Sequence, residues 1–231
     1  VSTLPAVSAL AQALHQEECQ CGDDCDHANC SHKHGAGNRQ GHKNRKKWPP
    51  ITPPGSLSIE RFKDLCTGCH LCVTQCPSQV LRPAGMEYGF DYLLKPHMSY
   101  LNSYCNYECT VCSEVCPTHA IRPITKEEKA TTQVGVAHFF INRCIVHTEN
   151  TDCGACSEHC PTQAVQMVPY KGTLTIPQVN PDLCIGCGGC ESICPVRPMR
   201  AIIIKANDVH KQVEKPKQEE VKEIEVTDFG F

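Results

Sequence analysis

The sequence predicts an α+β fold of short helices, short strands and much loop, in units that repeat along the chain. Three observations lead to this prediction. Cysteines form four close groups, and a proline follows the last cysteine of each group. After each Cys-Pro step the sequence favours a short helix and then a short apolar segment. The 231 residues contain only one Trp, six Tyr and six Phe, so a conventional apolar core along the whole length is not expected.

The spacing within the cysteine groups is the most specific signal. The first and last groups read C-x2-C-x2-C-x3-C-P, the run that binds [4Fe–4S] clusters in bacterial ferredoxins. The second and third groups begin with x3-x2 and x8-x2, and both end in the same Cys-x3-Cys-Pro. Three cysteines of a short loop can bind three irons of a cubane, while the fourth reaches the neighbouring cluster. In chain order the groups are Cys66, Cys69, Cys72 and Cys76; Cys105, Cys109, Cys112 and Cys116; Cys144, Cys153, Cys156 and Cys160; and Cys184, Cys187, Cys190 and Cys194.

Disulfides and structural zinc are the alternatives for a chain with twenty cysteines. Disulfide frameworks do not repeat one tight spacing four times, and zinc sites prefer two separated C-x2-C pairs. The sequence therefore predicts four [4Fe–4S] clusters in tandem 2[4Fe–4S] ferredoxin-like units. No phosphate loop, nucleophile elbow, or flavin or nicotinamide fingerprint is present. We therefore expect no catalytic residues, and an electron-transfer subunit or domain, alone or within a larger oxidoreductase.

The expected elements follow from capping and periodicity. Ser58 is a suitable N-cap for a helix that ends near Leu65, with Ile59, Phe62 and Leu65 on one face. Apolar segments follow the four Cys-Pro steps at 80–82, 120–122, 164–167 and 201–204. Strand-like runs precede the third and fourth groups at 137–141 and 174–179. We expect the folded four-cluster domain to span residues 51–206.

The flanking segments differ in composition from this domain. Residues 1–14 resemble the end of a signal or membrane segment, and residues 15–50 form a Cys/His-rich linker that we expect to be flexible. The linker is a candidate site for zinc or copper, with a metal-free tether as the alternative. Residues 207–231, rich in Lys and Glu, are expected to be a disordered charged tail. The candidate ligands of the linker are Cys19, Cys21, Cys25, Cys30, His27 and His32.

Charge and hydropathy limit the partners. A net charge of −3 gives no reason to expect a nucleic-acid partner. No stretch reaches eighteen consecutive apolar residues, so the sequence itself holds no membrane span.

From Thr52 to about Lys205 the chain resembles the four-cluster ferredoxins associated with periplasmic nitrate reductase and with methylamine utilisation. The resemblance rests on the TPPG lead-in at 52–55, the helical approach at 58–65, the first cysteine motif, the long gap in the third group and the late CIGCGGCESICP run. The second group departs from the family spacing. The resemblance implies electron transfer from a quinol-oxidising membrane protein, or an N-terminal membrane domain, to a redox enzyme. It also favours membrane association at the periplasmic face over the cytoplasm. A redox- or metal-sensing protein that works through the Cys/His-rich segment is the alternative function.

Analogy with other four-cluster electron-transfer subunits further implies nested pairing, first group with fourth and second with third. Sequential pairing, first with second and third with fourth, remains the alternative. The nested ligand sets are Cys66, Cys69, Cys72 and Cys194; Cys184, Cys187, Cys190 and Cys76; Cys105, Cys109, Cys112 and Cys160; and Cys144, Cys153, Cys156 and Cys116.

Overall fold

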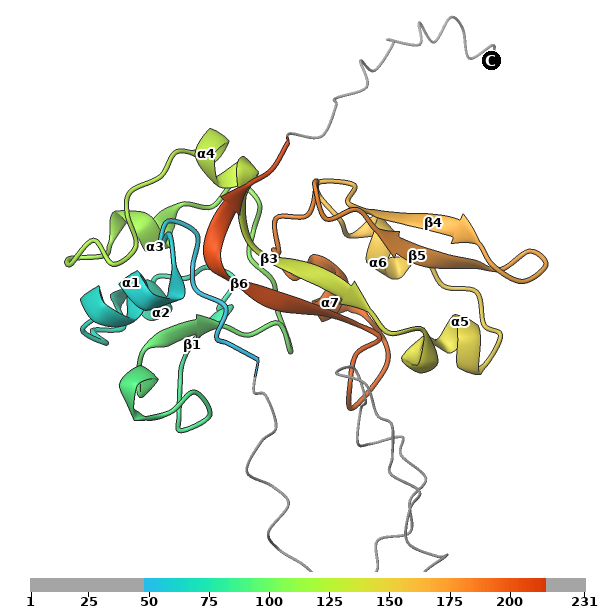
Figure 1. The fold of residues 1–231 in the computed structure, drawn as a ribbon, viewed down its shortest axis with the longest axis horizontal. Helices are drawn as coiled ribbons and strands as arrows, with labels where there is room; N and C mark the ends of the chain where they lie inside the picture. Colours follow the sequence, from blue (N-terminus) through green and yellow to red (C-terminus); the bar gives the residue numbers. More distant parts are fainter. Residues whose placement is uncertain (1–47, 215–231) are drawn as a thin grey trace, which may run out of the picture. The chain divides into compact units, whose positions relative to one another are not determined.

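The computed structural model describes residues 48–214. The predictions for the signal-like start, for most of the Cys/His-rich linker with its candidate metal ligands, and for the tail beyond 214 lie outside these residues. Within them the chain mixes short helices with three two-stranded antiparallel sheets, as the fold class predicts (Figure 1). The helices are α1 (Ile59–Leu65), α2 (Leu71–Thr74), α3 (Val111–Glu114), α4 (Lys126–Thr131), α5 (Ile145–Thr148), α6 (Ala155–Glu158) and α7 (Gly189–Ile193), with 3-10 turns at Phe90–Tyr92 and Ile141–Arg143. The strands are β1 (Leu81–Pro83), β2 (Pro96–Met98), β3 (Thr132–Phe139), β4 (Val165–Pro169), β5 (Thr175–Val179) and β6 (Ile202–Gln212).

Helix α1 has the predicted start and end. The Ser58 side chain accepts a hydrogen bond from the backbone N–H of Arg61 at 3.1 Å, which satisfies one donor of the first turn. Phe62 is buried, whereas Leu65 is exposed although it was expected on the same face. The guanidinium of Arg61 donates to the carbonyls of His119 and Ala120 at 2.8 and 3.0 Å. This helix therefore ties the lead-in segment to the end of the second cysteine group.

Strands β3 and β6 form the longest sheet, and they cross the middle of the view in Figure 1. Their register pairs Ala137 with Ile204, and it shifts between Gln133 and Gly135. Strand β6 continues to Gln212, so residues 207–212 belong to the fold and the expectation of a disordered tail from 207 is wrong there. These residues look solvated in the sequence because much of this end of the strand is exposed, while its backbone pairs with β3.

Segment 120–122 is not a strand, in contrast to the prediction. Its backbone is used elsewhere, because Arg122 donates its N–H to the carbonyl of Gly55 at 3.0 Å. A Cβ atom at position 55 would lie 2.6 Å from the Arg122 carbonyl oxygen, so a side chain there would push the segments apart. The TPPG lead-in thus occupies the place that a second strand would take.

Cysteine side chains belong to the core. Buried residues such as Phe62, Ile121, Val134 and Ile202 form one cluster, in which five of the repeat cysteines are buried and most of the others pack at its edge. Apolar side chains therefore surround thiols rather than filling the interior alone.

Candidate metal centres

The repeat brings its third and fourth cysteines into place by two local devices. The third cysteine of each group lies on a helix of one turn, in α2, α3, α6 and α7. The fourth lies at the start of a tight turn, closed in the first three groups by an N–H that donates back to the cysteine carbonyl: Gln79 to Cys76, His119 to Cys116 and Gln163 to Cys160, at 3.1 to 3.3 Å. These three donors have φ values of 52° to 53°, and this left-handed conformation closes the turn after the proline.

The thiols gather into four sets, which we call sites. Site 1 comprises Cys66, Cys69, Cys72 and Cys116; site 2 comprises Cys76, Cys105, Cys109 and Cys112; site 3 comprises Cys144, Cys153, Cys156 and Cys194; and site 4 comprises Cys160, Cys184, Cys187 and Cys190.

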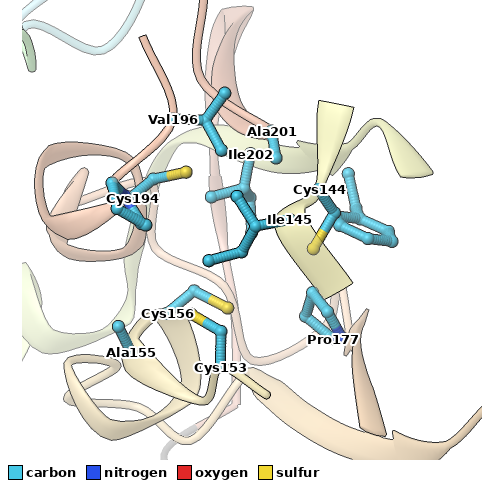
Figure 2. A pocket seen from close by; sticks show the side chains of 12 residues that line it. Cys144, Ile145, Cys153, Ala155, Cys156, Pro177, Cys194, Val196, Ala201 and Ile202 are labelled. Carbon is cyan, nitrogen blue, oxygen red and sulfur yellow. The ribbon is translucent and has the colours of Figure 1, made fainter. Parts of the chain in front are cut away.

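Sites 2 and 3 are hollows lined by their four cysteines and by apolar groups. At site 3 the lining includes Phe139, Ile145 and Ile202, and Figure 2 shows the sulfurs of the four cysteines pointing toward a shared space. At site 2 the lining includes Val80 and Leu81. Apolar walls limit the contact of the sulfurs with water, and the surroundings of the sulfurs tune iron–sulfur potentials.

Sites 1 and 4 are identified from the electrostatic effect of their cysteines on one another's pKa. Burial, followed by the negative charge of Cys66 and then of Cys116 and Cys69, raises the pKa of Cys72 to about 12. Burial also raises the pKa of Cys187 to about 12, with Cys160 and Cys184 among the groups that raise it. The thiols of Cys72 and Cys187 are therefore protonated without metal, and cluster binding must release those protons.

These thiol sets follow the sequential alternative rather than the nested pairing. Cys194 lies in the site 3 hollow rather than beside Cys66, and Cys116 acts on the thiols of site 1 rather than those of site 3. Likewise Cys76 belongs with Cys105, and Cys160 belongs with the fourth group. The physical reason is the connection between groups. The hairpin β1–β2 joins groups one and two, and the hairpin β4–β5 joins groups three and four, so that each returns the chain to the group it has just left.

The four sites fit the chemistry of a [4Fe–4S] cluster. A cubane requires one thiolate on each of four irons, and each site offers four thiols from two neighbouring groups. Within residues 48–214 no three His, Cys, Asp or Glu side chains group so as to hold a single metal ion. All sixteen repeat cysteines are free of disulfides.

Hydroxyl groups beside the fourth cysteines were not singled out from the sequence. Ser78, Thr118 and Thr162 each place an oxygen 3.6 to 3.8 Å from the sulfur of the cysteine two residues earlier. Once that sulfur is a thiolate only the hydroxyl can donate. The fourth group has Val196 at this position and lacks the hydroxyl. The Ser or Thr that follows Cys-Pro in three of the four groups is the sequence signal that could have indicated these hydroxyls.

Sites 2 and 4 meet directly. The N–H of Cys105 donates to the carbonyl of Cys187 at 2.9 Å, and the hydroxyl of buried Tyr100 donates to the carbonyl of Gly186 at 2.6 Å. A side chain at Gly188 would overlap the Tyr100 ring, so the loop of the fourth group passes close against residues 100–105.

Comparison with known proteins finds iron–sulfur relatives. A family model described as a 4Fe-4S dicluster domain matches residues 65–120 and 151–197, so that its first match spans groups one and two and its second spans most of groups three and four. The ferredoxin-type protein NapF of Escherichia coli is 27% identical over 163 residues, which cover 71% of this chain and 91% of that protein. The methylamine utilization ferredoxin-type protein MauM of Methylorubrum extorquens is 32% identical over 153 residues, which cover 62% of this chain and 67% of that protein. The chain belongs to the ferredoxin-type family of NapF and MauM.

Membership confirms the resemblance seen in the sequence and makes this ferredoxin-type protein a [4Fe–4S] electron carrier. The ferredoxin-type protein NapG of Escherichia coli is also similar, at 28% identity over 153 residues, 62% of this chain and 65% of that protein. In residues 48–214 no helix is both long and apolar enough to span a membrane.

Proposed function

We propose that this protein relays electrons through four [4Fe–4S] clusters, each held by one of sites 1 to 4. The observation that carries the proposal is the gathering of sixteen free cysteines into four sets of four. Each cluster, when bound, accepts and returns one electron. The chain's own residues supply the thiolates, exclude water and set the order of the sites.

The contacts between sites support the order 1, 2, 4, 3. Burial is the main cause that raises the pKa of Cys112 in site 2. The charge of Cys72 in site 1 raises it further, so sites 1 and 2 are neighbours. Sites 2 and 4 meet at the hydrogen bond between Cys105 and Cys187. Burial likewise raises the pKa of Cys190, with Cys156 of site 3 among the further causes. Sites 1 and 3 are then the two ends, and partners would exchange electrons there.

The proposed partners are a quinol-oxidising membrane protein, or a membrane domain of the same chain, at one end and a redox enzyme at the other. The similarity to NapF, NapG and MauM supports partnership with redox enzyme systems. Because the four sites already form a complete chain of thiol sets, deletion of residues 15–47 should leave electron throughput unchanged. A sensor that works through the Cys/His-rich segment would instead lose its response in that deletion.

Iron analysis and ligand substitution test the relay. Reconstituted protein should bind sixteen irons, four for each site, because each cubane contains four irons. Cys116→Ala should alter the same paramagnetic signal as Cys66→Ala, and Cys194→Ala the same signal as Cys144→Ala. An iron content near eight with zinc in the remaining sites would contradict the proposal. Grouping of Cys194→Ala with Cys66→Ala would restore the nested pairing.

We further propose that the protein works at the periplasmic face of the cytoplasmic membrane. The resemblance to ferredoxins of periplasmic nitrate reductase and the signal-like start of the sequence support this location. Treatment of intact cells with a membrane-impermeant thiol reagent should label Cys19, Cys21, Cys25 and Cys30. Labelling that requires cell lysis would place the domain inside the cytoplasm.

A further inference from the structure

Lys129 is a buried lysine beside site 2. It lies on α4 with only 3% of its surface exposed. Its ammonium donates to the carbonyl of Cys109 at 2.5 Å and also to the carbonyl of Asn106. Lysine is almost never fully buried without a partner of opposite charge, because removing an ammonium from water is costly.

The partner of opposite charge is missing from the described protein. None of residues 48–214 brings a carboxylate to Lys129, and its backbone partners are the two carbonyls. The anions on which its charge acts are the site 2 sulfurs. Burial raises the pKa of Cys105 and of Cys112, and in both cases Lys129 acts against burial by favouring the thiolate. For Cys105 it does so by charge and by a hydrogen bond.

Helix α4 is built to turn this side chain inward. A capping box fixes its start, since the Thr125 hydroxyl accepts from the N–H of Glu128 and the Glu128 carboxylate accepts from the N–H of Thr125. Lys129 and Ala130 are buried, whereas Lys126 on the preceding turn is exposed. One helix therefore carries two lysines of which only one faces the cysteines.

We propose that Lys129 is the built-in counter-cation of site 2 and raises the reduction potential of the cluster there. The inference deepens the proposed relay and rests on it. Reduction adds one negative charge to a cluster that is already anionic, so a nearby buried cation stabilises the reduced state. Lys129 is buried, so its charge is screened only weakly by solvent and salt.

The cations beside sites 1 and 3 are placed differently from Lys129. At site 1 the cation acting on Cys66 is Lys95, which is only partly buried. At site 3 the buried Arg200 donates to the carbonyl of Cys194.

The test is a redox titration of the full chain, reconstituted and followed by electron paramagnetic resonance. Cys109→Ser first assigns the site 2 signal, since Cys109 belongs to site 2 alone. Lys129→Met and Lys129→Gln should then shift that couple so that its reduced-to-oxidised ratio at a fixed potential falls at least tenfold, which is 59 mV for one electron. Lys129→Arg should restore most of the ratio, and Lys126→Met on the exposed turn should leave it unchanged.

Each result decides. A site 2 shift in the Met and Gln variants, with rescue by Arg, supports the counter-cation. An unchanged site 2 couple, or an equal shift of all four couples, overturns it. Loss of the site 2 signal from both neutral variants, with iron falling by four, also overturns it, because Lys129 would then be a clamp on the 106–109 loop that is needed for assembly. Failure of the relay itself would be visible separately, as fewer than sixteen irons in the unsubstituted protein.

Discussion

The N-terminal half of the repeat, from Cys66 to Cys116, and the C-terminal half, from Cys144 to Cys194, each build two thiol sites but surround them differently. In the N-terminal half both fourth cysteines have a hydroxyl beside the sulfur, from Ser78 and Thr118. In the C-terminal half Thr162 places a hydroxyl beside the Cys160 sulfur. Two residues after Cys194 the chain has Val196, which lacks a hydroxyl.

The Cys194 surroundings instead contain guanidinium groups. Arg197 donates to the carbonyl of Cys194 at 2.5 Å, and buried Arg200 donates to the same carbonyl and to that of Leu101. The repeat thus preserves the placement of the cysteine ligands and varies the polar groups around them. Cluster type follows from the first property and reduction potential from the second.

Metal removal should have the largest effect, and it should separate the halves. Thiols occupy the core, so chelation under reducing conditions should abolish the cooperative thermal transition of residues 51–206. The N-terminal half should lose amide protection first, because β1–β2 pairs only three residues on each strand, whereas β4–β5 in the C-terminal half pairs five. Hydrogen exchange with mass spectrometry measures both the unfolding and the order in which the two halves lose amide protection. An apoprotein that keeps its transition and its circular dichroism would contradict the prediction.

Substitution at the junction of the halves should have the next largest effect. Gly188→Ala puts a methyl group into the Tyr100 ring at φ 81°, and we expect a loss of more than about 3 kcal/mol. Gly172→Ala is the matched control, with φ 58° and open space around it, and should cost about 1 kcal/mol. The denaturant concentration at which half of the clusters are lost measures the destabilisation in each of the two variants. Equal midpoints would show that the junction does not hold the halves together.

Acid should loosen the contact between the lead-in segment and β6. Burial lowers the pKa of His210 from 6.5 to about 4, and its Nε2 lies 2.9 Å from the Thr52 hydroxyl while its Nδ1 is buried without a partner among the described residues. The unfolded chain takes up the proton first as pH falls, so the stabilisation is complete above pH 6.5 and is lost between there and about 4.

We expect this loss to reach about 3 kcal/mol. Exchange of the His210 amide, which donates to the Leu57 carbonyl, should report it. His210→Gln, which cannot take up the proton, should remove the pH dependence. The prediction is wrong if the wild-type and Gln proteins show the same acid profile.

The hydroxyl difference should give the smallest effect. Thr162→Val removes a donor to the Cys160 sulfur and should lower the site 4 potential by roughly 40 mV, the equivalent of about 1 kcal/mol for one hydrogen bond. Val196→Thr should raise the site 3 potential by a similar amount, and Thr151→Val, outside the Cys-Pro turns, serves as control. Redox titration measures all three. A higher site 4 potential in Thr162→Val, or a lower site 3 potential in Val196→Thr, would show that the hydroxyls do not donate to sulfur.

The sequence by itself determined the cluster type and much of the local structure. Cysteine spacing is a local property, because three thiols within seven residues can surround one centre whatever the rest of the chain does. The Ser58 cap and the alternation in 164–167 and 174–179 are equally local, and α1, β4 and β5 confirm them.

The grouping of each fourth cysteine with a thiol set depends on the fold and cannot be read from the sequence. Nested and sequential pairing use the same sixteen residues, and they differ only in how the hairpins β1–β2 and β4–β5 return the chain. The same holds for β6 beyond residue 206, whose polar sequence looks solvated until β3 pairs with it. It holds also for Lys129, an ordinary surface lysine by sequence, whose burial beside Cys105 comes from the way α4 packs. Contacts between distant segments depend on loop paths and packing, and a pattern of residue types does not encode these locally.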